Sequence, residues 1–258
     1  MRFGKIGARS MMYQWKNPYI TDGLVAMWDG EWNAGGGVHD DEHIITNLVS
    51  GVQTMIPNLG YTINGNSIIS AVSYSFLFND ILPITGKTEF TLESVGCCES
   101  KPTIASNTSG SFSVRGIGLL FMWRKDINSN SGVTGIVGCG VYRQSDGRIH
   151  YYGAPSNVVV ANQEVDAEVF GVMHSRSAVF SIAGNSAPLL YRDGHANDGT
   201  NTMSYTDAVV TTNLYRVSTP SASSCAVRWA NLRVYYRALT ADEIAHNYAI
   251  DRARFNLP

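Results

Sequence analysis

The chain has 258 residues, of which 44% are hydrophobic and 16% are charged, and 19 basic against 21 acidic residues give a net charge of −2. This length suffices for one large β-domain with a filled core. There is no basic excess for nucleic acid, and no apolar run approaches the roughly 18 residues of a membrane span, so we expect neither partner.

Residues 1–20 are predicted to form an N-terminal arm. The arm is basic and lacks the apolar core of a signal peptide, which fits a protein released by cell lysis. Its apolar side chains are too many for a free tail, so we expect it to pack against the domain or to dock onto a neighbouring subunit or a virion surface. They are Met11, Met12, Tyr13, Trp15 and Tyr19.

The middle of the chain reads as about a dozen short strands separated by turn residues. Gly23–Asp29 is the first, and the glycine-rich loop Gly30–Asp41 follows it. Asp-Gly pairs at 146–147 and 193–194 predict tight hairpin turns. The further expected strands are Ala71–Phe78, Thr88–Val95, Gly116–Trp123, Val133–Arg143, Arg148–Tyr152, Val165–Met173, Ser177–Ala183, Pro188–Arg192, Thr202–Val210 and Thr212–Ser218.

The stretch Val227–Phe255 predicts a last strand followed by one helix. Thr240 and Glu243 have the spacing of a capping box, and Leu239 with Ile244 fits a hydrophobic staple around it. The helix is expected to bury an apolar stripe at i, i+3, i+4 and i+7. The residues of that stripe are Ala241, Ile244, Ala245 and Tyr248.

Two segments carry a family resemblance. LRVYYRALTADEIAHNY, at 232–248, resembles the closing strand and helix of laminin-G-like, concanavalin A-like domains, and Gly23–Asp40 resembles their opening strand and loop as found in proteins of gut bacteria and their phages. The resemblance implies an all-β fold, an antiparallel β-sandwich (jelly roll) of residues 21–258 with one short C-terminal helix. It does not imply an activity, because the fold serves lectins, glycosidases and structural modules alike.

A sequence motif of the glycosidases with this fold indicates whether the chain could be catalytic. Its glycosidases carry E-x-D-x-x-E on one strand, so that paired carboxylates flank the scissile bond. This chain lacks that motif, and its nearest set, Glu89, Glu93 and Glu99, is expected to consist of solvent-facing strand carboxylates. We therefore expect a protein that is not an enzyme, with a glycoside hydrolase as the alternative.

Glycan binding needs exposed aromatic faces beside hydrogen-bonding groups. Two stretches offer both, one around the glycine-rich loop and one after the 146–147 turn. The candidate residues are Asp29, Trp32, Asn33, His39, Asp40, Tyr151 and Tyr152. The other tryptophans considered, Trp28, Trp123 and Trp229, are expected in the core.

Metal binding has weaker candidates. Asp40, Asp41 and Glu42 are oxygen donors on a loop, as calcium prefers, although a solvated polar loop is the simpler interpretation. The four cysteines show no C-x-x-C spacing, so we expect buried reduced thiols or one bridge that includes Cys225. They are Cys97, Cys98, Cys139 and Cys225.

The sequence thus favours a binding or decoration module. With the resemblance, it suggests a phage virion protein, such as a head decoration, fibre or tail component, that binds host-surface glycans and assembles with itself or with virion proteins through its arm. The alternative is a secreted or surface carbohydrate-binding protein of a gut bacterium.

Overall fold

A computed structural model of the chain describes most of its strands and its C-terminal helix. The described residues are 17–30, 44–55, 61–64, 67–70, 89–100, 119–124, 136–143, 148–153, 158–163, 165–181, 188–197, 199, 203–206, 215–216 and 227–258. They form sixteen strands and one helix. The elements are β1 (Leu24–Asp29), β2 (Ile44–Thr46), β3 (Gln53–Met55), β4 (Tyr61–Asn64), β5 (Ser67–Ser70), β6 (Glu89–Cys98), β7 (Leu119–Arg124), β8 (Ile136–Arg143), β9 (Arg148–Gly153), β10 (Val158–Gln163), β11 (His174–Ser181), β12 (Leu189–Arg192), β13 (His195–Ala196), β14 (Met203–Thr206), β15 (Tyr215–Arg216), β16 (Val227–Tyr235) and α2 (Ala241–Phe255).

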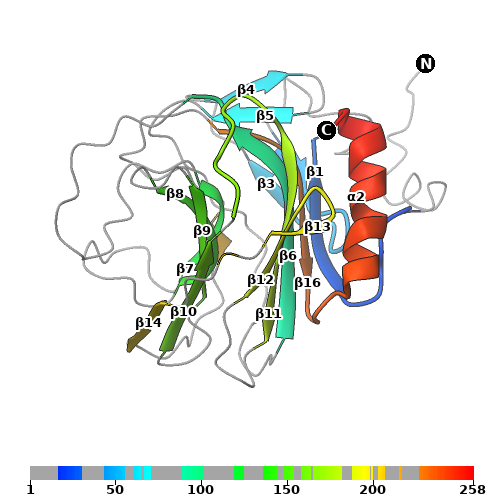
Figure 1. Cartoon of the computed structure of the whole chain (residues 1–258). Coiled ribbons are helices and arrows are strands. Elements are labelled where there is room, and N and C mark those ends of the chain that lie inside the picture. The colour runs from blue at the N-terminus through cyan, green and yellow to red at the C-terminus, as the bar shows by residue number, and fades with distance from the viewer. Residues whose placement is uncertain are drawn as a thin grey trace, which may run out of the picture.

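The strands form two large antiparallel sheets and one small one. The eight-stranded sheet has the order β13-β12-β11-β6-β16-β5-β4, with β1 also paired to β16. The six-stranded sheet has the order β14-β10-β9-β8-β7-β15, and β2 pairs with β3. The two large sheets stand as two layers, and α2 covers the face of the eight-stranded sheet that points away from the other layer (Figure 1). We call this covered side the outer face and the opposite side the inner face.

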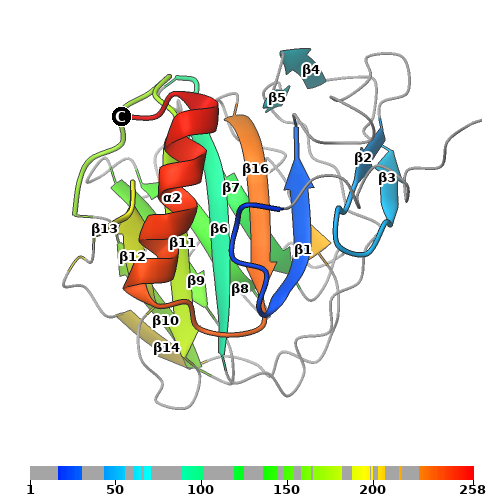
Figure 2. The ribbon, with the colours of Figure 1, turned by 90° about the vertical axis from the view of Figure 1, so that its right-hand side faces the viewer.

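β16 is the strand around which the eight-stranded sheet is built. It pairs with β6 along one side, while β5 and β1 share its other side end to end. The register shifts between Trp229 and Asn231, so Ala230 forms a bulge. Figure 2 shows β16 between β6 and β1, with α2 lying across the sheet. The last strand of the chain is therefore central, as a strand buried on both faces must be.

Part of the inner face of this sheet is apolar, since strand residues alternate between faces. Phe90 of β6 stacks on Phe180 of β11 with ring centroids 4.4 Å apart. The tryptophans expected in the core include Trp28 and Trp229, and both are buried, at 2% and 3% exposure. The side chain of Trp123 lies outside the described residues.

The helix α2 begins as its sequence predicts. The Thr240 hydroxyl accepts a hydrogen bond from the Glu243 backbone N–H, and the Glu243 carboxylate accepts one from the Thr240 backbone N–H. These two bonds complete the capping box. Leu239 and Ile244 meet in one buried cluster, so the staple is confirmed. The expected apolar stripe is wrong in part, because Ala241 and Ala245 are exposed. The buried residues are Ile244, Asn247 and Asp251.

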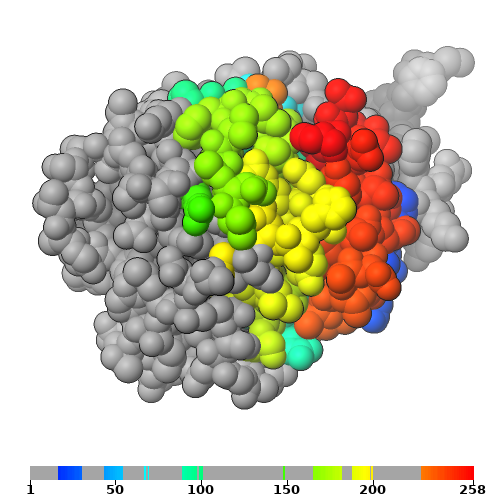
Figure 3. All heavy atoms as spheres, viewed as in Figure 1, coloured from blue at the N-terminus to red at the C-terminus, as the bar shows by residue number. Residues whose placement is uncertain are grey.

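Most expected strands are found with shifted ends, and the differences follow from tertiary context. Val165–Met173 forms no strand and instead connects β10 to β11 as a loop. Its valines are exposed, so its β-branched residues gave a misleading signal. The strands β2 to β5 and β10 were not predicted, and the expected strand Ala71–Phe78 lies outside the described residues. Figure 3 shows this loop, the β12–β13 hairpin and α2 side by side along one edge.

The hairpin between β12 and β13 turns at Asp193-Gly194, as predicted. Both residues have positive φ, 51° and 75°, which is the type I′ pattern. Gly194 also lies directly against α2, since a Cβ atom there would lie 2.6 Å from Cδ1 of Tyr248. The other turn predicted from an Asp-Gly pair, at 146–147, lies outside the described residues.

We expect Gly194→Ala to destabilise the protein more than Gly51→Ala. Gly51 has a similar φ of 77° but open space around it, so alanine there adds backbone strain of about 1 kcal/mol. At Gly194 the displaced Tyr248 ring adds about 1–2 kcal/mol. Urea unfolding of both variants measures the difference, and equal losses would show that α2 does not press on this turn.

Candidate functional site

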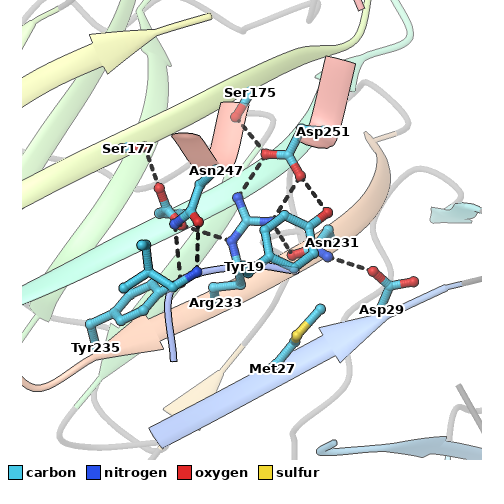
Figure 4. Close-up of polar contacts among 12 residues, drawn as sticks. Tyr19, Met27, Asp29, Ser175, Ser177, Asn231, Arg233, Tyr235, Asn247 and Asp251 are labelled. Carbon is cyan, nitrogen blue, oxygen red and sulfur yellow. Dashed lines mark hydrogen bonds and ion pairs between the residues drawn. The ribbon is translucent and has the colours of Figure 1, made fainter. Parts of the chain in front are cut away.

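The charged residues on the outer face converge on Arg233 of β16, which is fully buried. Its Nε donates to Oε2 of Glu93 on β6 at 2.7 Å. Its Nη1 and Nη2 donate to the two carboxylate oxygens of Asp251 on α2, at 2.8 and 2.7 Å (Figure 4). A guanidinium bound at both oxygens of a carboxylate is among the strong charge-assisted pairs. Arg233 thus joins two neighbouring strands to the helix.

Polar side chains complete the bonding of both carboxylates. Ser177 donates to Glu93 Oε1 at 3.0 Å, and Asn247 donates to Glu93 Oε2 at 2.8 Å. Ser175 donates to Asp251 Oδ2 at 2.9 Å. Each of these four carboxylate oxygens therefore has a donor, as buried charges require.

Tyr19, just before β1, reaches into the same cluster. Its hydroxyl donates to Asp251 Oδ1 at 2.7 Å and accepts from Arg254 Nη1 at 2.8 Å. The guanidinium of Arg233 lies over its ring, 4.1 Å from the centroid. Tyr19 is only 3% exposed, so the last residues of the predicted arm pack against the domain. The expected arm boundary at residue 20 stays a prediction.

A second ion pair borders the first. Asp29 of β1 binds Arg254 of α2 with both oxygens, at 2.7 and 2.9 Å, and also accepts from Asn231. The outer-face cluster therefore holds three carboxylates, of Glu93, Asp251 and Asp29, against the guanidiniums of Arg233 and Arg254. With all of them ionised, it would carry one net negative charge in a buried place, which favours uptake of a proton.

Among these acids, Glu93 has a raised pKa. Burial raises the pKa of Glu93, with Arg233 opposing the rise and Asp251 adding to it. Burial also raises the pKa of Tyr19, so its hydroxyl stays a donor. For Arg233, burial lowers the pKa, but Asp251 and Glu93 more than offset this and leave the guanidinium charged. Arg233 is bidentate to Asp251 and makes a single bond to Glu93, so Glu93 is the less compensated acid.

Chemically, this cluster holds elements in place. Its acids and guanidiniums bond to one another, and α2 and the segment Asn17–Ile20 cover it. A ligand would reach it only by displacing one of these two elements. The sequence contained a signal for it, since Asn247 and Asp251 lie four residues apart on one helix face.

Another polar group lies at the inner face, beneath the loop that connects β10 to β11. Arg176 of β11 binds Glu168 of that loop and donates to the Gly96 carbonyl at 2.9 Å. Arg192 of β12 contacts His174 Nε2 at 2.6 Å and donates to the Ala167 carbonyl at 3.2 Å. The other oxygen of Glu168 is buried and has no hydrogen-bond partner among the described residues. These contacts hold the loop onto the sheet, and sequence patterns did not predict them.

The predicted glycan-binding residues lie in different parts of the structure. Asp29 is fully buried and engaged with Arg254. Tyr151 and Tyr152 lie on β9 in the six-stranded sheet, whereas the candidates of the glycine-rich loop lie outside the described residues. Those undescribed candidates are Trp32, Asn33, His39, Asp40, Asp41 and Glu42.

The expectation that all three glutamates of the β6 region face solvent is wrong. Glu89 is exposed, but Glu93 is 1% exposed because it faces α2 and Arg233. Glu99 is partly exposed and paired with Arg228. β6 is a central strand, and α2 covers its outer face. A β6 side chain that points to this face, such as Glu93, is therefore buried rather than solvated.

Cysteine and metal predictions are tested only in part. Cys97 is buried and free, as expected, and burial followed by the charge of Glu99 raises the pKa of its thiol to about 12. The other three cysteine side chains lie outside the described residues. Among the described residues, no three His, Cys, Asp or Glu side chains gather as metal ligands would. Within that same part of the chain, the one helix is too short and polar to cross a bilayer.

Comparison with known proteins gives a likeness of fold alone. No family model matches the chain, and no curated protein matches its sequence. A Trypanosoma rangeli sialidase in complex with sialic acid aligns over 88% of this chain and 32% of its own, with a TM-score of 0.55 and 11% identity.

Two further solved structures are similar. A mutant of HCR/D aligns over 90% of this chain and 52% of its own, with a TM-score of 0.56 and 11% identity. The binding domain of Paraclostridial Mosquitocidal Protein 1 aligns over 91% and 53%, with a TM-score of 0.51 and 12% identity. This chain spans about a third of the sialidase and about half of the other two.

We expect Arg233→Met to lower the free energy of unfolding by about 3–5 kcal/mol, because it leaves buried carboxylates without their counter-charge. Arg237→Met is the matched control. Arg237 pairs with Glu243, and the two side chains are partly exposed, at 23% and 26%, so this substitution should cost about 1 kcal/mol or less. Chemical denaturation compares the two, and similar losses would mean that the buried cluster does not hold α2.

Glu93 and Glu243 should affect stability with opposite pH dependence. The raised pKa of Glu93 gives a contribution that is complete below its unfolded pKa and lost as pH rises through its folded pKa. A hydrogen bond from Arg237 lowers the pKa of Glu243 to about 2, so its contribution is present above its unfolded pKa and lost as pH falls.

Stability of the unmodified chain relative to Glu93→Gln should therefore decline with rising pH. Relative to Glu243→Gln it should instead decline as pH falls toward 2. Denaturation of the three proteins across pH 2–9 measures both trends. A Glu93 difference that grows with pH would contradict a raised pKa of Glu93.

Proposed function

We propose that this chain is a non-enzymatic glycan-binding module with a concanavalin A-like, laminin-G-like antiparallel β-sandwich. The two antiparallel layers support the sandwich, and so does the likeness to solved structures over 88–91% of the chain. In this arrangement the two large sheets pack their inner faces together, as β-sandwiches do.

The observation that supports a binding role is the kind of protein to which this fold is similar. One similar protein is a sialidase in complex with sialic acid, and another is the binding domain of a mosquitocidal protein. Identities of 11–12% transfer no residues, so the ligand-contacting side chains must come from this chain itself.

The aromatic candidates supply the expected glycan contacts. In our proposal Trp32, Tyr151 and Tyr152 cover apolar sugar faces, while Asn33 and His39 bond to hydroxyls. Calcium on Asp40, Asp41 or Glu42 would be an accessory, as it orders loops through oxygen ligands. Asp29 supports this region through β1, since its carboxylate is occupied by Arg254.

The proposed setting is a phage particle, as a head decoration, fibre or tail component that meets glycans of the host surface. The alternative is a secreted or surface carbohydrate-binding protein of a gut bacterium. The sequence resemblance motivates both settings, and a glycan ligand is common to them.

A structural role in an assembly is the second candidate. It is favoured by the anchoring of Tyr19 and Ile20 against α2, which fixes the end of the predicted arm on the domain. Residues that reach from this point could contact a neighbouring subunit or another virion protein.

Glycan arrays that include sialylated glycans test the leading proposal, followed by titration calorimetry on the best ligand. We expect Trp32→Ala and Tyr151→Ala each to weaken binding roughly tenfold or more, because each removes a stacking face. His195→Ala, at an exposed position on β13, should leave affinity unchanged.

Release of free sugar from the bound glycan would show instead that the protein is a glycoside hydrolase. An array without binding, obtained with folded protein, would overturn the glycan role and leave the assembly role standing.

A further inference from the structure

Residues Asn17–Ile20 cover part of the outer face of the eight-stranded sheet, beside α2. This segment crosses beside α2 and then turns into β1 (Figure 2). The Tyr19 ring is buried against the guanidinium of Arg233, and its hydroxyl bonds to the carboxylate of Asp251. We call this place, between α2 and β1, the Tyr19 site.

The Tyr19 site has the features of a peptide-binding site. It holds the backbone as well as the side chain, because Ile20 N–H donates to Asn247 Oδ1 at 3.0 Å and His246 Nε2 lies 2.9 Å from the Pro18 carbonyl. The Tyr19 hydroxyl bonds to two charged groups, and its ring lies under a guanidinium. Backbone bonds with one deep side-chain pocket are how peptide grooves recognise short segments.

The connection from this segment to the sheet is an exposed turn. Thr21 and Asp22 are exposed, and Gly23 has a φ of 73°. Sheet bonding begins after them, with the Tyr236 N–H donating to the Gly23 carbonyl at 2.9 Å. The segment can therefore leave the Tyr19 site by opening this turn, without breaking the pairing of β1 with β16.

The distribution of charge indicates which molecule could supply a segment to this site. Arg2, Lys5, Arg9 and Lys16 are the basic residues of the first twenty, which include no acidic one. The rest of the chain holds the other 15 of the 19 basic residues and all 21 acidic ones. A basic arm thus precedes a domain with a net charge of about −6, so the arm of one copy is complementary to the domain of another.

We propose that the Tyr19 site is an exchangeable peptide site, which takes Asn17–Ile20 of a second copy of this chain. The basic residues that precede the segment then lie on the acidic domain of that copy. This inference rests on the proposed assembly role of the arm, and it adds the site, its ligand and the exchange between copies. Reciprocal exchange closes a two-fold dimer.

Isotope mixing of the full chain tests the exchange. Equal amounts of ¹⁵N-labelled and unlabelled protein are mixed, cross-linked with a carbodiimide between Lys16 and carboxylates, and analysed by mass spectrometry. We expect cross-links that join labelled to unlabelled chains, and a light-scattering mass about twice the 28.1 kDa of one chain. High salt should reduce the dimer, because charge complementarity drives it.

A conservative variant separates exchange from simple association. Exchange makes the same contacts at the Tyr19 site within one copy and between copies, so Tyr19→Phe should leave the dimer fraction nearly unchanged. It should speed the mixing of labels roughly tenfold or more, because the segment detaches without breaking its hydroxyl bonds to charged groups. Tyr248→Phe on α2, whose hydroxyl bonds to the Pro258 carbonyl, should leave the mixing rate unchanged.

Three outcomes would overturn the proposal. A dimer whose Lys16 cross-links join only chains of the same label excludes exchange and keeps the assembly role. A monomer at all concentrations excludes both, while glycan binding can still be present. Equal mixing rates for the unmodified chain and Tyr19→Phe would show that the Tyr19 site does not control the exchange.

Discussion

The fold of the described chain depends on one buried guanidinium. Arg233 lies in the sheet with no exposed surface, and an unpaired charge in such a place costs several kcal/mol. Glu93 and Asp251 supply the counter-charges from β6 and α2, so the strand, its neighbour and the helix must meet in one arrangement. Apolar contacts alone would allow the helix to slide or rotate, whereas a bidentate pair fixes its position and its rotation about its axis.

This constraint explains why the eight-stranded sheet differs between its faces. The inner face is closed by stacked rings such as Phe90 and Phe180 and by the ion pair of Arg176 with Glu168. The outer face is closed by the Arg233 cluster, Tyr19 and α2. Both faces of the central strands are therefore buried. Among the described residues, the edges of this sheet and its connecting loops stay open to other ligands, which agrees with the general placement of binding residues on loops of rigid domains.

The sequence predicted what depends on neighbours along the chain. The capping box at Thr240 and the Asp193-Gly194 turn are set by residues within four positions, and both are found. It did not predict the face of Glu93, because that depends on Arg233, which lies 140 residues away. For the same reason the predicted apolar stripe of α2 included Ala245, whereas two of the three buried residues, Asn247 and Asp251, are polar and bond to charged groups of the sheet. Of the glycan candidates, Asp29 shows the limit most clearly, since its role is decided by Arg254 at the other end of the chain.

The two proposed binding sites lie on different sheets, and their separation is relevant to function. Tyr151 and Tyr152 belong to the six-stranded sheet, whereas α2 and the Tyr19 site lie on the far side of the eight-stranded one (Figure 1). The eight-stranded sheet stands between them, so exchange of the N-terminal segment would not cover a glycan held by either tyrosine. An assembled pair would then present two such sites at once, and linked sites raise the effective affinity for a surface that carries many copies of one glycan. The buried charges that fix α2 would in this way also determine how the proposed glycan sites are displayed.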